Sequence, residues 1–152
     1  MTRTLISQTP RHGVTLVETA IVLSLAMTVI VGLLELVVFM NRYQSCSHAV
    51  RRLAREAVLR GNRSGPEKTV WGPTEITTTA SSSHDIAQIV RPWLMMVRPE
   101  DVTIRIRYPD GDNRRGDRVQ IDLSYPFTRT SRLFGASPSL VKTITSTMEI
   151  AH

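Results

Sequence analysis

The sequence predicts an α+β protein in which a long N-terminal transmembrane helix is followed by a small module of one helix on a three-stranded antiparallel sheet. Three features support this: an almost unbroken apolar run from Thr19 to Met40, a helical stripe after residue 83, and alternating segments after residue 101. We expect four parts in the 152 residues: a short basic leader (1–13), a transmembrane and extended amphipathic helix (14–60), a linker (61–83) and the module (84–152).

The apolar run is long enough to cross a membrane. About 20 apolar residues span a hydrocarbon core about 30 Å thick, and the run has no polar positions at helical spacing. A secretory signal ending near Ala49 is disfavoured, because the run is longer than the apolar core of a signal, about 7–15 residues. We therefore expect membrane lipid as a partner.

The helix is expected to continue beyond Met40 as an amphipathic segment that stops at Gly61. Its apolar residues recur at i, i+3 and i+4, while arginines occupy the other faces. The apolar set is Cys46, Val50, Leu53, Ala54, Ala57 and Val58. Because Cys46 is the single cysteine, it can form no internal disulfide. We favour a buried thiol on the helix over the alternative, a disulfide to a partner chain.

The linker is rich in Gly, Pro, Ser and Thr, and Ile76–Thr79 could form a short edge strand within it. A helix is predicted next, capped by Ser83 or Asp85 and kinked or split at Pro92. Its apolar stripe is Ile86, Ile89, Val90, Trp93, Leu94 and Val97.

Two alternating segments, 102–108 and 119–125, predict half-buried strands joined by a turn at Pro109–Asp112. Pairing Tyr108 with Val119 would place Arg105 opposite Asp122. Residues 140–150, rich in Thr and β-branched side chains, predict the third strand. We expect the helix and strands to bury their apolar faces against each other, so that the module folds without the span.

The formal net charge of +6 is interpreted as a solvated basic surface, and no nucleic-acid partner is expected. The four histidines are scattered and show no metal-ligand spacing. The acidic turn that begins at Asp110 has Ile121 where a calcium loop requires a glutamate. We therefore predict no catalytic residue, no metal and no cofactor, and we do not expect an enzyme.

Two carboxylates and a row of small residues mark the span. Glu18 follows Gly13 at the fifth position, at the mouth of the apolar run, where a charge is costly. Glu35 lies 21 residues after Val14, a rise of about 32 Å, which predicts an interfacial carboxylate near the far edge. The small residues, which predict a helix-packing face, are Ala20, Ser24, Thr28 and Gly32.

The segment Gly13-Val14-Thr15-Leu16-Val17-Glu18 resembles the processing site of type IV prepilins, although many pilins carry Phe where Val14 stands. The resemblance implies that a prepilin peptidase cuts between Gly13 and Val14, with methylation of the new N-terminus. Cleavage would remove two arginines and lower the formal charge to +4. Glu18 could then attract the terminal amine of a neighbouring helix, which predicts a role in subunit docking.

The chain also resembles TadE-like proteins of tight-adherence (Tad) pilus systems, through Glu35 late in the span, Tyr43-Gln44-Ser45, and Ala54-Arg55-Glu56-Ala57 without the Gly that often follows the Glu. This implies a pilin-like subunit (minor pilin or pseudopilin) or accessory protein for Tad-type pilus assembly or related secretion. The implied partners are other pilin-like subunits and the Tad assembly machinery.

The same resemblance implies a single-pass protein of the bacterial inner membrane, with a cytoplasmic N-terminus and an extracytoplasmic module. Entry into a surface pilus is left open. The basic residues counted alone favour the opposite orientation, because four arginines from Arg42 to Arg55 outnumber Arg3 and Arg11. The alternative function is a fixed single-pass anchor that presents a small extracytoplasmic binding module.

Overall fold

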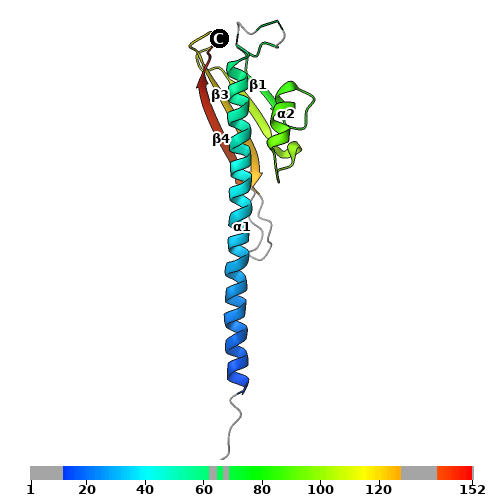
Figure 1. Ribbon diagram of the computed structural model, residues 1–152, viewed down its shortest axis with the longest axis vertical. Coiled ribbons are helices and arrows are strands. Elements are labelled where there is room, and N and C mark those ends of the chain that lie inside the picture. The colour runs from blue at the N-terminus through cyan, green and yellow to red at the C-terminus, as the bar shows by residue number, and fades with distance from the viewer. Residues whose placement is uncertain (1–11, 62–64, 67–68, 128–139, 152) are drawn as a thin grey trace, which may run out of the picture.

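The structure is a computed structural model, and it describes residues 12–61, 65–66, 69–127 and 140–151. A single long helix, α1 (His12–Val58), extends from a small head formed by its own C-terminal part and the rest of the chain (Figure 1). We call the projecting part of α1, residues 15–40, the stem. The division of the chain at residues 13, 60 and 83 stays a prediction.

Helix α1 begins two residues before the predicted start and ends two before the predicted end. Nothing interrupts it, because the sequence from His12 to Val58 contains no proline and only Gly13 and Gly32 as glycines. Past Val58 the chain tightens, with the Leu59 amide donating to the Glu56 carbonyl and the Arg60 amide to the Ala57 carbonyl. The predicted long helix is therefore confirmed.

The sheet has four strands, where the sequence predicted three. The strands are β1 (Ile76–Thr79), β2 (Thr103–Arg107), β3 (Arg118–Phe127) and β4 (Leu140–Glu149), antiparallel and in sequence order. The extra strand is the segment assigned to the linker as a possible edge strand. It pairs Thr78 with Ile104 and so satisfies an edge of β2 that would otherwise be unpaired.

The predicted register is confirmed, since Arg105 lies opposite Asp122 in the ladder between β2 and β3. Tyr108 follows the end of β2 and packs beneath the segment before β1. There Gly72 has a φ of +92°, and a Cβ on it would lie 2.5 Å from the Tyr108 ring. Glycine is required at that position by both the backbone conformation and the close approach.

The second helix is shorter than its apolar stripe suggests. Helix α2 (Asp85–Val90) gives way to the 3₁₀ turn η1 (Arg91–Trp93), which contains Pro92, so the predicted interruption is confirmed. A second 3₁₀ turn, η2 (Pro99–Asp101), precedes β2. The predicted cap is wrong, because the Ile86 amide donates to Nδ1 of His84 and not to Ser83 or Asp85. The short loop places the imidazole, one residue before the helix, over the free amide.

The core lies between the inner face of the sheet and two helices. Residues of α1 contact β3 and β4, and α1 also packs against α2, so the prediction of one helix on the sheet is corrected. The amphipathic stripe of the long helix packs against the inner face of β3 and β4. The α1 contribution, at 0 to 2% exposure, is Cys46, Ala49, Val50, Leu53, Ala54 and Ala57. The module therefore buries part of its apolar surface against α1. From the sequence we expected its helix and strands to bury these faces only against each other.

Candidate functional site: the exposed stem and the polar face of the sheet

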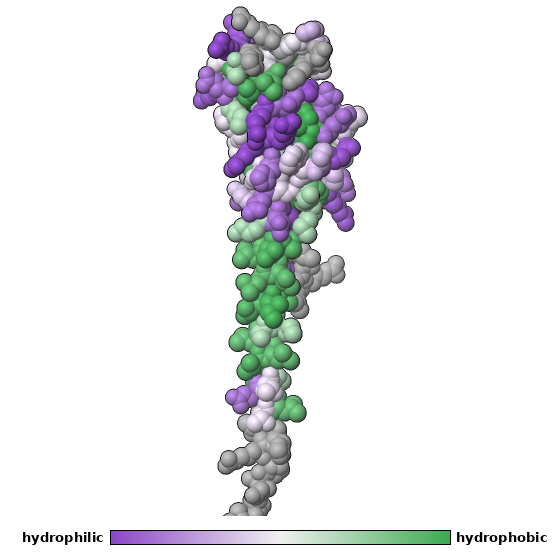
Figure 2. Space-filling view, viewed as in Figure 1, coloured by the Kyte–Doolittle hydropathy of each residue, from purple (hydrophilic) through white to green (hydrophobic). Residues whose placement is uncertain are grey.

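The stem is apolar and exposed. Leu16, Leu25 and Leu34 are 61 to 69% exposed, and the most apolar 18-residue window of α1 has no buried residue. Figure 2 shows this hydrophobic surface below a head that is mostly hydrophilic on the face in view. Among the described residues, α1 is the one helix long and apolar enough to cross a membrane. Water is a poor environment for such a surface, so lipid or another apolar helix must cover it.

The predicted packing face lies along the stem, and all four of its small residues, Ala20, Ser24, Thr28 and Gly32, are exposed. Its hydroxyl groups are already used within the helix. Ser24 Oγ donates to the Ile21 carbonyl at 2.8 Å, and Thr28 Oγ1 donates to the Ser24 carbonyl at 2.8 Å. At Gly32 a Cβ would meet no atom within 4 Å. The face therefore offers close approach to a neighbouring helix through its small size, and not through free hydrogen-bond donors.

The two carboxylates of the span lie on the same helix but in different surroundings. Glu18 is exposed near the start of α1, whereas Glu35 is half-buried toward the head. Gly13 and Val14 form the first turn of α1 with His12, so the predicted processing site is helical in the uncut chain. The structure does not bring Glu18 and Glu35 together, because 17 residues of helix separate them by about 26 Å.

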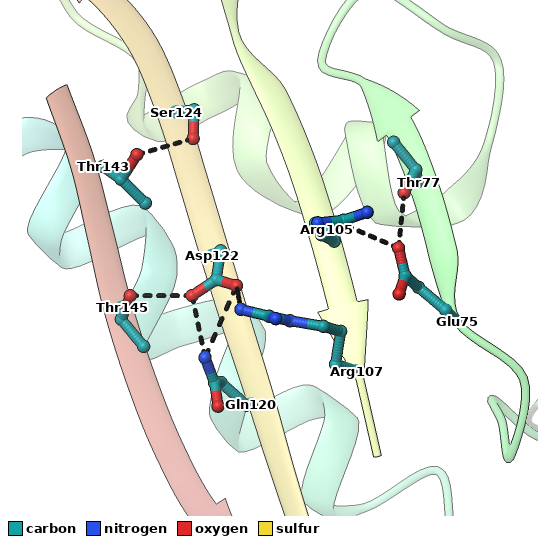
Figure 3. Close-up of polar contacts among 9 residues, drawn as sticks. All are labelled: Glu75, Thr77, Arg105, Arg107, Gln120, Asp122, Ser124, Thr143 and Thr145. Atoms are coloured by element: carbon teal, nitrogen blue, oxygen red, sulfur yellow. Dashed lines mark hydrogen bonds and ion pairs between the residues drawn. The ribbon is translucent and has the colours of Figure 1, made fainter. Parts of the chain in front are cut away.

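Polar side chains cover the outer face of the sheet, and Asp122 is the residue around which they are arranged (Figure 3). This carboxylate is 7% exposed. It forms an ion pair with Arg107, and it accepts hydrogen bonds from Thr145 Oγ1 at 2.7 Å and Gln120 Nε2 at 3.2 Å. Burial by itself would raise the pKa of Asp122, but the hydrogen bonds from Thr145, Gln120 and Arg107 outweigh it and lower the pKa.

A second pair on the same face ties β2 to the segment before β1. Arg105 binds the carboxylate of Glu75, which also accepts a hydrogen bond from Thr77 Oγ1 at 3.4 Å. Farther along, the hydroxyl groups of Ser124 and Thr143 bond at 2.9 Å across β3 and β4. These groups bond to one another, most of them across neighbouring strands, so the face stabilises the sheet and presents no activated nucleophile–base pair among the described residues.

The acidic turn is tied to arginines and to the backbone. Arg118 binds Asp110 through its side chain at 2.7 Å and through its amide at 2.7 Å, which lowers the pKa of Asp110 to about 2. Asp112 pairs with Arg114 at 2.7 Å. The described part of the chain contains no group of three His, Cys, Asp or Glu residues that could hold a metal ion. Cys46 is buried, as predicted.

Sequence reasoning missed Asp122, Arg107 and Glu75 as members of one polar face. Alternation already placed Asp122 on the outer side of its strand, but its burial depends on the two flanking strands. A separate buried contact was also not predicted: Asn113, between β2 and β3, is 4% exposed and donates from Nδ2 to the Trp71 carbonyl at 2.9 Å. That contact spans 42 residues, and no local pattern predicts it.

These features define a class of protein, a small α+β head carried on one helix that is able to span a membrane. A model of the family described as TadE-like protein matches residues 13–55. The predicted resemblance is confirmed over that segment, which indicates a Tad pilus-associated protein. Searches of curated proteins and of solved structures returned no match.

Proposed function

We propose that this chain is a pilin-like subunit, a minor pilin or pseudopilin, or an accessory protein for Tad-type pilus assembly or related secretion, acting through helix packing and not through catalysis. The observation that carries the proposal is that the family match and the exposed apolar stem coincide on one helix. A stem with no buried residue in its most apolar window can exchange lipid for a neighbouring helix without unfolding the head.

In this proposal the N-terminus is cytoplasmic and the head extracytoplasmic. Three of the four arginines that oppose this orientation, Arg51, Arg52 and Arg55, are exposed on a part of α1 whose other face is in the head core. The positive-inside rule counts basic residues in short loops and near the ends of a span, whereas folded domains cross the membrane largely regardless of their charge. Because these arginines belong to a folded head, they weigh less against a cytoplasmic N-terminus than they would in a short loop.

The packing of the head core disfavours cleavage of the chain near Ala49. Leu53, Ala54 and Ala57 lie in the core together with Cys46 and Val50, all on one continuous helix. A cut in that region would divide the core. The stem and head are therefore expected to remain one polypeptide in the membrane.

Cross-linking between helices in the membrane tests the assembly role. Single cysteines are introduced at Thr28 and at Ile30, in a chain whose Cys46 is replaced by Ala. The two positions are about 200° apart around the helix, so Ile30 is the matched control. We expect Thr28→Cys to cross-link to pilin-like subunits encoded with this chain and Ile30→Cys to do so far less. Equal or absent cross-linking at both positions would favour the fixed anchor that presents a binding module.

A further inference from the structure

The head carries a group of exposed apolar side chains at the end where the stem leaves it. We call this group the rim and define it as Trp93, Met95, Met96, Leu140 and Val141. The five side chains are 47 to 71% exposed. Beyond residue 45, the other large hydrophobic residues that are exposed in the described head are Leu59 and Val70, at 39 and 46%. Exposed apolar residues are normal singly, but five at one end of a head call for a partner.

Two contacts fix the height of the rim along α1. On one side, Ser45 Oγ donates to the Trp93 carbonyl and accepts from the Met95 amide at 3.0 Å. Ser45 lies five residues past Met40, the last residue of the apolar run, which is about 7.5 Å along the helix. The turn that carries Trp93 and Met95 is therefore held just beyond the end of the stem.

On the other side, the ring of Phe127 meets Phe39 edge to face with centroids 5.0 Å apart. Leu140 is the register partner of Phe127, and Val141 that of Pro126. The start of β4 therefore lies level with the last turn of the apolar run. In Figure 1 both β4 and the segment after α2 reach the stem end of the head.

The headgroup layer on each face of a bilayer is about 5 to 7 Å thick outside a hydrocarbon core of about 30 Å. When the stem crosses the core and Met40 marks its boundary, the rim falls within or against that layer. Its composition suits this place, because tryptophan is enriched at membrane–water interfaces and the flexible methionine side chains adapt to irregular surroundings. Lys142, exposed beside Val141, is placed to meet anionic lipid headgroups.

We propose that the rim rests in the headgroup layer of the bilayer that α1 crosses, so that the head lies on the membrane at a set height and tilt. The occupant of this surface is phospholipid. The rim continues the membrane-facing surface of the stem, with the contacts of Ser45 and Phe39 making the two surfaces contiguous. This inference rests on the membrane insertion of the stem contained in the proposed function.

Spin labels on single cysteines in the full chain test this, in bilayers of phosphatidylethanolamine and phosphatidylglycerol with Cys46 replaced by Ala. The labelled sites are Met95 and Leu140 in the rim, Val70 as a matched exposed control, and Leu25 in the stem. Oxygen, which partitions into lipid, and a polar nickel complex report the surroundings of each label. We expect the ratio of oxygen to nickel accessibility at residues 95 and 140 to be several-fold above that at residue 70.

The site at Leu25 separates the two proposals. A lipid-exposed label at residue 25 with water-exposed labels at 95 and 140 would overturn the rim and leave the span intact. A water-exposed label at 25 would overturn the span itself. Dipolar broadening between labels at 95 or 140, without lipid exposure, would identify a second copy as the occupant and would also overturn the proposal.

A second measurement needs no cysteine. Trp71 is 2% exposed, and its amide is bonded to the Arg60 carbonyl at 3.0 Å. Arg60 lies 20 residues past Met40, about 30 Å along the axis of α1, so Trp71 is out of reach of the lipid. Brominated lipids should therefore quench only the emission of Trp93, and Trp93→Phe should abolish that quenching. Unquenched emission in the unmodified chain would contradict the proposal even where a labelled variant failed to fold.

Discussion

Arg107 forms the ion pair with Asp122 across β2 and β3. Its neighbour Arg105 is the residue that lies opposite Asp122 in the register, but Arg105 instead pairs with Glu75. Both arginines lie on the outer face of β2. Arg107 pairs with Asp122 of β3, whereas Arg105 pairs with Glu75 in the segment before β1, on the other side of β2. The buried carboxylate therefore joins β2 and β3, and through Thr145 it also joins β4.

This arrangement predicts an acid-dependent contribution to stability. The folded pKa of Asp122 is lowered, so its contribution is present above the ordinary aspartate pKa of about 3.9 and is lost as the pH falls below that value. We expect Asp122→Asn to cost about 1–3 kcal/mol at pH 7, because Thr145, Gln120 and Arg107 would lose a charged acceptor at a site that is 7% exposed. The difference from the unmodified chain should shrink on acidification, as measured by thermal unfolding in detergent.

The two arginines provide the control for this prediction. Arg107→Met should reproduce part of the loss and of its pH dependence. Arg105→Met removes an equal charge from the same strand but leaves the Asp122 contacts in place. A difference between Asp122→Asn and the unmodified chain that stays constant below pH 4, or an Arg105→Met variant that matches Arg107→Met, would show that the Asp122 network does not carry the effect.

The core predicts where the chain can be shortened. A fragment of residues 61–152 lacks the α1 residues that cover β3 and β4, whereas a fragment of residues 41–152 retains them. We expect the longer fragment to unfold cooperatively on heating and the shorter one to lack a cooperative transition. Circular dichroism of both fragments decides this, and a cooperative melt of the 61–152 fragment would revive the expectation of an independent module.

Two leucines test the same core within the full chain, one inside α1 and one directly after its end. Leu53 is 0% exposed, and Leu53→Ala should cost about 2–5 kcal/mol through lost burial and a cavity. Leu59 is 39% exposed, and Leu59→Ala should cost less than about 0.5 kcal/mol. Similar losses in both variants, measured by thermal unfolding in detergent, would mean that α1 does not form part of the cooperative core.

The junction of leader and stem predicts a covalent cut. In cells that contain a prepilin peptidase, we expect the membrane-extracted protein to begin at Val14, because a small residue precedes the bond and Glu18 follows at the fifth position. Replacement of Gly13 by Val should block the cut by crowding the bond. N-terminal sequencing reads both outcomes directly. An unmodified protein that begins at Met1 would show that the bond between Gly13 and Val14 is not cut.

Glu18 is predicted to guide docking between subunits once Val14 carries a free amine. We expect Glu18→Gln to leave processing and membrane insertion intact but to reduce cross-linking from Thr28→Cys, since an unpaired charge is disfavoured where the dielectric is low. Glu35→Gln is the matched control, because it removes the same charge near the head. Unchanged cross-linking with Glu18→Gln would leave that residue with no docking role.

Local patterns determined the elements of this protein. An apolar run without proline forms one helix whatever surrounds it, and the spacing of Cys46, Val50 and Leu53 identified the face that is buried. Alternation located β2 and β3 and fixed their register, because a slip by one residue would turn every apolar side chain outward. Pro92 interrupts the helix after α2, because proline has no backbone N–H to donate and its ring clashes with the preceding turn.

Only the tertiary structure decided which faces meet. The segment Ile76–Thr79 has only four residues and lies in a stretch rich in Gly, Pro, Ser and Thr, so its pattern indicates at most an edge strand. It joins the sheet because β2 offers it an edge. His84 replaces the expected caps because the preceding turn aims its ring at a free amide. Asp122 becomes buried because β2 and β4 flank it. It pairs with Arg107 and not with Arg105, because Arg105 binds Glu75 on the other side of β2. The strand and ion-pair contacts join residues far apart in the chain, so their energies do not appear in any local window of the sequence.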